Sequence, residues 1–391
     1  VAYEEAMERL HEEYPDDREA TAFYALAINQ TALPTDKSYS QQLKAAALLE
    51  ELFAEDPEHP GLAHYIIHAF DHPPLASRAL DAARRYASIA PSAPHALHMP
   101  SHTFTRVGSW QESIDTNIAS ARTALRDGST AEALHAMDYQ VYAYLQTGQD
   151  AAARGVVNEA PRIVAQLDLG ALGGAAPPVA GLYAAAAIPA RYAMERGAWS
   201  DAAALELNPT PFAYVDAITH FARAVGAARS GNVPVAKTDA EALHTLGKKL
   251  SNAKESYWAE QLRIQREVAL AWIAFAEGRQ DEALDRLREA AAAEDRTDKS
   301  AISPGPLAPA RELLGEMLLA VGKPAEALKE FEATLGKEPN RFRATWLAAR
   351  AAGKAGDTAA ARKHYAELVA ICKAGDSPGR PELREAREAL I

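Results

Sequence analysis

The sequence predicts an all-α protein built from repeated helix pairs, and three observations support this. Alanine dominates the 391 residues, whereas aromatic residues make up 7% and β-branched residues are sparse, a composition that favours helices. A chain of this length exceeds one ordinary globular core, so it favours several domains or a repeat array. Glycines also recur at a fixed distance from a small residue along much of the chain.

The glycine pattern indicates tight turns between paired helices. Gly322 and Gly356 are 34 residues apart, and so are Gly197 and Gly231. A small residue, where a second helix would cross the first closely, stands five positions after each glycine. The seven glycine and small-residue pairs are Gly108/Ser113, Gly148/Ala153, Gly197/Ala202, Gly231/Ala236, Gly278/Ala283, Gly322/Ala327 and Gly356/Ala361.

This pattern resembles the tetratricopeptide repeat (TPR), in which helix A, a glycine turn and helix B form one unit. The segments AVGKPAEALKEFEATLGKEP and KAGDTAAARKHYAELVAIC match it best, and the resemblance covers roughly residues 17–372. It implies a right-handed α-solenoid whose A helices line a concave groove. Function in such an array depends on the side chains that these A helices carry.

The same features divide this single solenoid into segments. We expect loops at 168–178 and 294–306, because both stretches are rich in turn-forming residues. The expected segments are an orphan helix of a preceding repeat at 1–16, N-terminal repeats with a His-rich groove at 17–167, middle repeats at 179–293, C-terminal regular repeats at 305–372 and a capping tail at 373–391.

Charge and composition exclude several classes of partner and site. A net charge of −12 opposes binding to nucleic acid, which needs a basic face. No apolar run approaches the ~20 residues that span a bilayer, so we expect no membrane insertion. Cys372 is the one cysteine, which excludes an internal disulfide and any multi-cysteine metal site.

Eight of the twelve histidines lie between His59 and Tyr144. His64/His68 and His98/His102 are two pairs with i,i+4 spacing, which places each pair on one helix face. Counted back from the turns, three successive A helices carry polar residues at two equivalent positions. These residues are His64, His98 and Asp138 at one position and His68, His102 and Tyr142 at the other.

The register therefore predicts a transition-metal site in the groove of the N-terminal half. Neighbouring helices pack ~8–10 Å apart, so imidazoles from adjacent A helices can reach one ion. Imidazole is a good ligand for Zn, Cu, Fe or Ni. The predicted metal ligands are His64, His68, His98 and His102.

Further residues are candidates for supporting the metal or binding a ligand. Asp71 can orient an imidazole, and Asn117, a polar residue at a packing position, can bond towards the histidines. Arg106 is either an anchor for an anionic substrate or a solvated helix end. The full set is His95, His135, Asp138, Asp71, Tyr139, Tyr142, Arg106 and Asn117.

Motifs of other common chemistries are missing. The pair in HYIIH lacks the glutamate of HExxH, and no phosphate-binding loop, dinucleotide fingerprint or GxSxG elbow occurs. The motifs HxxxH and HxxHMPSH, in AHYIIHAFD and APHALHMPSHTFTRVGSW, together with DYQVYAYLQTG, are similar to a bacterial group of larger TPR proteins of uncharacterised function. That resemblance implies further helices upstream and an extracytoplasmic (periplasmic) location, and it implies no reaction.

Two functions follow. The first is a TPR-repeat protein whose His-rich metal site binds or transforms a small ligand. The alternative is a metal-free scaffold for protein–protein interaction that holds an extended peptide in the groove. A peptide scaffold would spread Lys, Arg or Asn over many repeats, whereas here the polar residues are clustered and are mostly histidine. The clustering favours the metal site.

Overall fold

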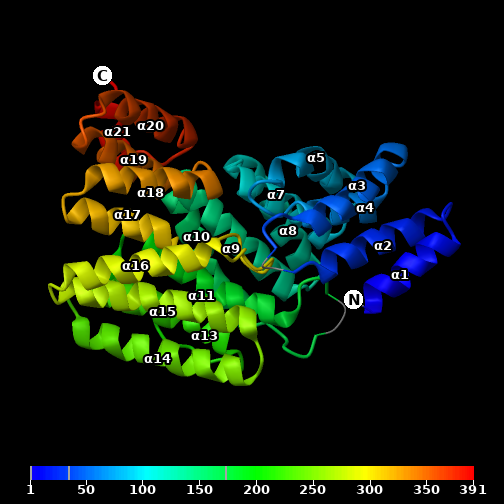
Figure 1. The fold of residues 1–391 in the computed structure, drawn as a ribbon, viewed down its shortest axis with the longest axis horizontal. Coiled ribbons are helices and arrows are strands. Elements are labelled where there is room, and N and C mark those ends of the chain that lie inside the picture. Colours follow the sequence, from blue (N-terminus) through cyan, green and yellow to red (C-terminus); the bar gives the residue numbers. More distant parts are fainter. Residues whose placement is uncertain (1, 34–35, 172–173) are drawn as a thin grey trace.

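The computed structural model describes residues 2–33, 36–171 and 174–391 of the chain. Within these ranges the regular structure is entirely helical, and the helices stack in pairs along the chain (Figure 1). The expected loop at 168–178 includes residues 172 and 173, which lie outside the described part. The all-α solenoid of TPR-like helix pairs is confirmed.

The helices are numbered in chain order. They are α1 (Ala2–Glu13), α2 (Arg18–Thr31), α3 (Ser40–Glu55), α4 (Pro60–Ala69), the 3-10 helix η1 (Ala76–Ala79), α5 (Leu80–Ile89), α6 (Pro94–His98), α7 (Pro100–Val107), α8 (Trp110–Arg126), α9 (Thr130–Gln146), α10 (Asp150–Val164), α11 (Pro178–Glu195), α12 (Trp199–Ala203), α13 (Ala213–Arg229), α14 (Val233–Asn252), α15 (Ser256–Ala276), α16 (Gln280–Asp295), α17 (Ala310–Ala320), α18 (Pro324–Lys337), α19 (Phe342–Lys354), α20 (Thr358–Ile371) and α21 (Pro381–Glu388).

A helices pack against their own B helices and, in most repeats, against the A helix of the next repeat. Helix α9, for example, contacts α8, α10 and α11, and α13 contacts α11, α14 and α15. One pair cannot cover its apolar face alone, so neighbouring pairs share their cores. The largest cluster of buried apolar side chains accordingly runs from Tyr183 to Ala351 without interruption by repeat boundaries.

A second apolar cluster holds the N-terminal repeats together and extends from Ala22 to Phe104. Between it and the clusters of the later repeats lies a buried layer that is unusually polar. This layer contains His98, Ser101, His102, Thr103, Thr105, Arg106, Ser113, Asn117, Ser120, His135 and Asp138. The candidate histidines thus lie where the N-terminal core meets the rest of the solenoid.

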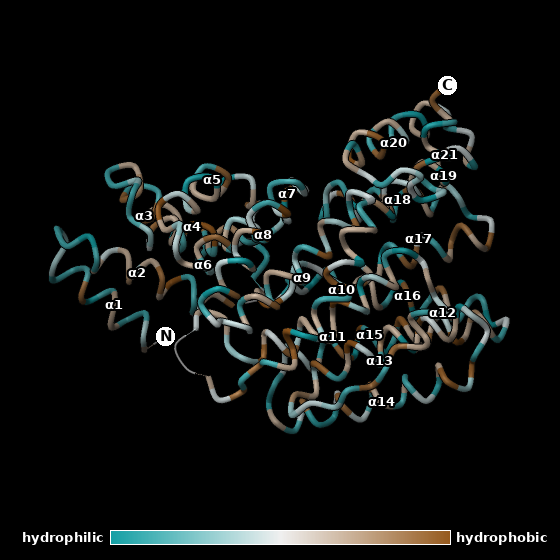
Figure 2. Tube along the Cα trace, turned by 180° about the vertical axis from the view of Figure 1, so that it is seen from behind, coloured by the Kyte–Doolittle hydropathy of each residue, from teal (hydrophilic) through white to brown (hydrophobic). Residues whose placement is uncertain are grey.

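The two ends of the chain are also helical. Helix α1 lies against α2, where the rings of His11 and Tyr24 stack and the Tyr24 hydroxyl donates to Glu8. At the other end, α21 packs on α20 and buries Leu383. Hydrophilic and hydrophobic residues alternate along the helices (Figure 2), and none of the described helices is both long enough and apolar enough to cross a membrane.

All seven turn glycines of the sequence pattern have the left-handed conformation expected of them, with φ between 64° and 87°. Gly108 is under a second constraint. A Cβ at this position would lie 2.5 Å from the carbonyl oxygen of Pro339. The same contact region includes the Trp110 indole, which donates to Asn340 O, and the Asn340 amide, which donates to Gly108 O. The turn between α7 and α8 in this way touches the segment before α19.

The segment between α16 and α17, residues 296–309, crosses the groove, and we call it the strap. In Figure 1 it is the yellow coil that reaches from the end of α16 towards the N-terminal half. The Lys299 ammonium lies 2.9 Å from Asp71, and the Tyr139 hydroxyl donates to the carbonyls of Ala301 and Ser303. The expected loop is present, and it fills part of the concave face.

Gly108→Ala should destabilise the protein more than Gly278→Ala. Both changes force a Cβ into the left-handed region, at about 1–2 kcal/mol each. Only Gly108 faces backbone at 2.5 Å, because a Cβ at Gly278 meets nothing within 4 Å. Urea unfolding of both variants measures the difference, which we expect to be at least ~1 kcal/mol. Equal losses of unfolding free energy in the two variants would show that the backbone at Pro339 moves away without destabilising the protein.

Candidate metal centre

The A helix that carries two of the histidines is divided into two short helices. Helix α6 ends at His98, α7 begins at Pro100, and Met99 lies between them. Pro100 has no N–H to continue the hydrogen-bond ladder, so it starts a new helix. The break leaves His98 and His102 with their Nε2 atoms 3.2 Å apart.

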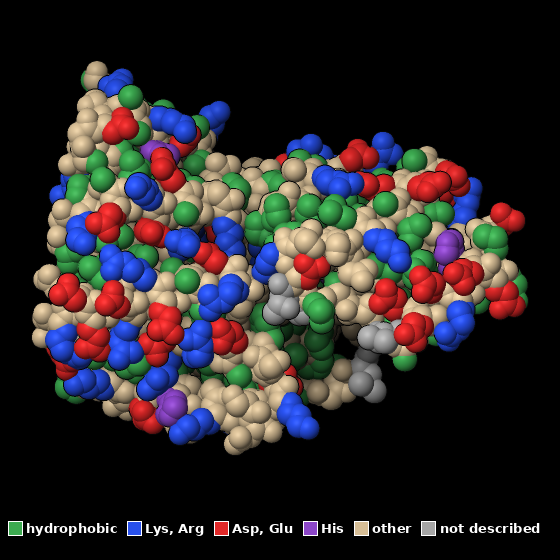
Figure 3. Space-filling view, viewed as in Figure 1, with side chains coloured by type: hydrophobic (Ala, Val, Ile, Leu, Met, Phe, Trp, Pro, Cys, Tyr) green, Lys and Arg blue, Asp and Glu red, His purple; other side chains and the backbone are tan. Residues whose placement is uncertain are grey.

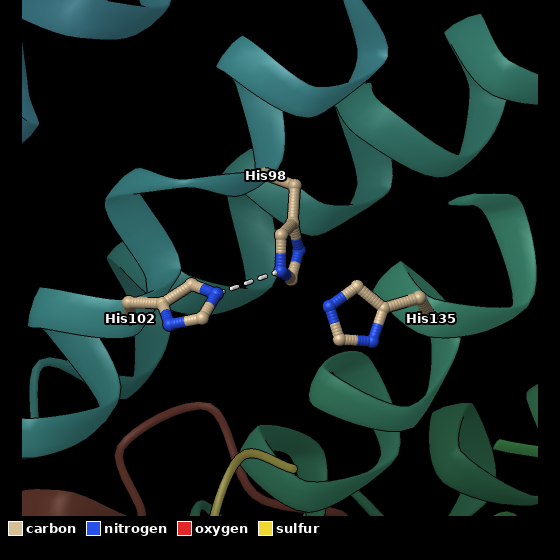
Figure 4. A group of neighbouring side chains, drawn as sticks. All are labelled: His98, His102 and His135. Carbon is tan, nitrogen blue, oxygen red and sulfur yellow. Dashed lines mark hydrogen bonds between the residues drawn. The ribbon is translucent and has the colours of Figure 1, made fainter. Parts of the chain in front are cut away.

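His135, in α9, completes a triad with these two residues. Suitable ring nitrogens of His98, His102 and His135 all lie within 4.8 Å of one another. Figure 4 shows the three rings converging from α6, α7 and α9 on one point. The side chains are 2%, 2% and 7% exposed, and little histidine surface is visible on the face shown in Figure 3. Three imidazoles are therefore buried together.

Hydrogen bonds to the outer nitrogens fix which nitrogen of two rings carries the proton. The Asn117 amide nitrogen donates to Ser113 O at 2.7 Å, so its oxygen faces His98. That oxygen lies 2.7 Å from His98 Nδ1, which must therefore donate. Likewise His102 Nδ1 lies 3.0 Å from an Asp71 carboxylate oxygen, which can only accept while Asp71 is ionised.

Both Nε2 atoms consequently present lone pairs to each other across 3.2 Å. Two neutral rings in this arrangement have no hydrogen to share, and their partial negative charges repel. Burial lowers the pKa values of His98 and His102 well below 6.5, which disfavours an added proton. The arrangement suits a cation that accepts both lone pairs.

His135 has the character expected of a third ligand. Its Nδ1 atom is buried and has no hydrogen-bond partner among the described residues. Burial also lowers its pKa to about 3, so the ring is neutral at ordinary pH. In Figure 4 the other ring nitrogen, Nε2, points towards His98 and His102, and it is the atom placed to share an ion with them.

Asp71 joins the triad to the rest of the groove. Its carboxylate accepts from His102 Nδ1, from Arg106 Nε at 2.8 Å and from Lys299 Nζ at 2.9 Å. Burial by itself would raise the pKa of Asp71, but Lys299 and Arg106 lower it well below the ordinary value. Arg106 is thus 3% exposed and bonded to Asp71. The solvated helix end that the sequence allowed for Arg106 is therefore wrong, and its role as an anchor for an anionic substrate stays a prediction.

Tyr139 covers the triad on the side of the strap. Its ring centroid lies 4.7 Å from that of His98 and 5.3 Å from those of His102 and His135. Its hydroxyl donates to strap carbonyls, as described above. Tyr139 therefore packs on the three imidazoles and fixes the strap above them.

The remaining histidines of the cluster lie next to the triad. The ring centroid of His68 lies 5.9 Å from that of His102, and the His64 ring lies 4.7 Å from His68 and 5.1 Å from His95. The Tyr86 hydroxyl bonds to His64 Nδ1, and burial lowers the pKa of His68 to about 4. His64, His68 and His95 are thus neighbours of the triad.

Two other candidates lie in a separate part of the polar layer. Asp138 pairs with Arg191 at 2.7 Å, with both side chains fully buried, and Tyr142 accepts from Arg341 at 3.1 Å. Sequence reasoning identified neither arginine and did not identify Lys299 as a partner of Asp71. A signal was present for Arg191, a charged residue within the apolar stretch AAAAIPARYAM, but nothing in the local sequence marks Lys299.

Comparisons with known proteins add little to the geometry. No model of a known protein family and no curated protein matches the chain. The crystal structure of the APC/C hetero-tetramer Cut9–Hcn1 is similar over 95% of this chain and 96% of that one, with 11% identity and a TM-score of 0.29. The TPR domain of P58(IPK) is similar over 94% and 98%, with 13% identity and a TM-score of 0.28. Neither similarity concerns the histidines.

The stability of the metal-free protein should fall in mild acid because His135 stays neutral when folded. Below its ordinary pKa of 6.5 and down to about 3, the unfolded chain binds a proton that the folded chain does not. The free energy of unfolding then drops by about 1.4 kcal/mol per pH unit for each such histidine, and this contribution vanishes above pH 6.5.

His135→Gln should remove one such contribution. Chelator-treated protein, unfolded in urea between pH 7 and pH 4.5, should show a flatter pH dependence in this variant than in the unaltered protein. His244→Gln, in α14, is the control and should leave the slope unchanged. An unchanged slope for His135→Gln would mean that His135 is protonated in the folded state.

Proposed function

We propose that this protein binds one divalent transition-metal ion through His98, His102 and His135 and uses it to bind or transform a small ligand. The observation that carries the proposal is the pair of facing Nε2 lone pairs, each fixed by an acceptor on its own Nδ1. Metal-binding histidines typically have this arrangement, in which the outer nitrogen donates to a carboxylate or an amide oxygen. The proposed set shares His98 and His102 with the sequence prediction and takes His135 as the third ligand.

The donor set favours a borderline metal with an open position. Three imidazoles suit Zn, Cu, Fe or Ni, and three histidines with one free site are typical of zinc centres that activate water. Such an ion would supply a Lewis acid or a metal-bound hydroxide. Asp71 and Asn117 would orient the rings, and Tyr139 would exclude water on one side.

A cavity that none of the three triad histidines lines is connected to this centre through two cations. It has a volume of about 100 Å³ and is bordered by Arg106 and Lys299, the two cations that hold Asp71. Its wall is aromatic, with the rings of Tyr214 and Trp258 stacked at 4.3 Å. Polar groups at one end of an apolar wall are typical of small-ligand pockets.

The alternative, a metal-free scaffold for an extended peptide, has one observation in its favour. The concave face already holds a non-helical segment, the strap, by hydrogen bonds to main-chain carbonyls. TPR-like solenoids commonly present such grooves. The metal proposal and this one differ in whether the triad is occupied by an ion.

Metal analysis of protein purified without a His tag or added metal tests the proposal. We expect about one equivalent of Zn, Cu, Fe or Ni, because three converging neutral imidazoles bind such ions well. The double variant His98→Ala/His102→Ala should lose the metal, and His244→Ala should keep it. Metal-free protein whose melting temperature does not change on adding Zn, Cu, Fe, Mn or Ni would refute the metal site and favour the scaffold.

Asn117 should tune metal affinity without touching the ion. Asn117→Leu removes the acceptor of His98 Nδ1 and should weaken binding by about tenfold to a hundredfold. Asn117→Asp keeps an acceptor and should retain the affinity. Competition with a chromogenic chelator measures both constants. Equal weakening by the two changes would attribute the effect to packing.

A further inference from the structure

The strap occupies the concave groove as a peptide ligand would, although it belongs to the same chain. Its main chain accepts hydrogen bonds from Tyr139, at Ala301 O and Ser303 O, and from Arg191 Nη1, at Pro306 O. Its side chains bind as well. Asp298 lies 2.7 Å from Lys37 and 3.2 Å from His72, in the N-terminal half. These contacts join parts of the chain more than a hundred residues apart.

The strap is bonded to residues that surround the triad. The Lys299 side chain is 5% exposed and bonded to Asp71, which holds His102. Tyr139 packs on the three imidazoles and donates to the carbonyls of Ala301 and Ser303. The triad itself is at most 7% exposed, so an ion or a ligand can reach it only when a covering segment moves.

The first half of the strap, residues 296–301, is easier to displace than a helix. It contacts the N-terminal half through hydrogen bonds and ion pairs made by single side chains, and segments with few apolar contacts open at the low end of the range of local stabilities. The second half is anchored, because Ile302 packs on the largest apolar core and Leu307 and Ala308 belong to it. Helices α16 and α17 are stacked in the solenoid on either side, so they can stay folded while the strap moves.

We propose that residues 296–301 are a displaceable cover of the histidine centre, and that ions and ligands reach the triad when this half of the strap leaves the groove. The ions and ligands in question rest on the proposed function above. Covering of the triad does not depend on it, because access to the imidazoles can be measured without metal.

Histidine acylation by diethyl pyrocarbonate, read by mass spectrometry on the chelator-treated full chain, measures this access. In the unaltered protein, His98, His102 and His135 should react at least about tenfold more slowly than half-buried His244, because opening must precede reaction. Asp298→Asn weakens the bonds to Lys37 and His72, and Lys299→Glu places a like charge against Asp71. Each should speed acylation of the triad by about tenfold or more.

Asp295→Asn is the matched control. It makes the same change three residues before Asp298, where the carboxylate pairs with Arg311 and not with the N-terminal half, and it should leave the rates unchanged. Unchanged triad reactivity in both Asp298→Asn and Lys299→Glu would overturn the cover. Faster acylation in a protein that binds no metal would support the cover and refute the metal site, so the two failures are distinguishable.

Discussion

The bonds to the Asp71 carboxylate connect the histidine-bearing repeats to each other and to the strap. Asp71 follows α4, and its three cationic or N–H partners come from α7 and from the strap, more than two hundred residues further along the chain. A buried carboxylate is stable only when it is fully paired, and here three donors satisfy it. Removing any one of them would leave a carboxylate lone pair without its donor in a site nearly closed to water. The orientation of the His102 ring, the position of the strap and the packing of α4 against α7 are therefore energetically linked.

This linkage explains why the polar layer persists inside a helical repeat protein. Alanine-rich pairs such as those of the middle repeats pack around one large apolar cluster. Around α6, α7 and α9, by contrast, the contact surfaces contain imidazoles, hydroxyls and an amide whose donors and acceptors are largely matched to one another. Such networks contribute little net stability but specify one arrangement. The exceptions among the described residues are the facing Nε2 atoms of His98 and His102, which have no hydrogen to share, and His135 Nδ1, which has no hydrogen-bond partner.

The fold and part of the site could be predicted from the sequence because both depend on local periodicity. Left-handed glycines at a fixed offset determine where helix pairs turn, and the register counted from Gly108 and Gly148 placed His98 and Asp138 at equivalent positions. These two residues nevertheless make different contacts. Asp138 faces Arg191 of the next repeat, while His135, three residues earlier, turns towards His98. A shift of about one helical turn changes which side chain a residue contacts. Counting positions from the glycine turns does not predict that contact.

Contacts between distant repeats could not be read from the sequence at all, and one of them affects how the whole molecule responds to force and heat. An open solenoid behaves like a spring, since each repeat touches only its neighbours and can unwind from either end. Here the turn at Gly108 is bonded to Asn340, which fastens the second histidine repeat to the start of α19. These hydrogen bonds connect the two halves of the solenoid across the groove. Stretching or fraying of the C-terminal repeats must break them, so the two halves should unfold together.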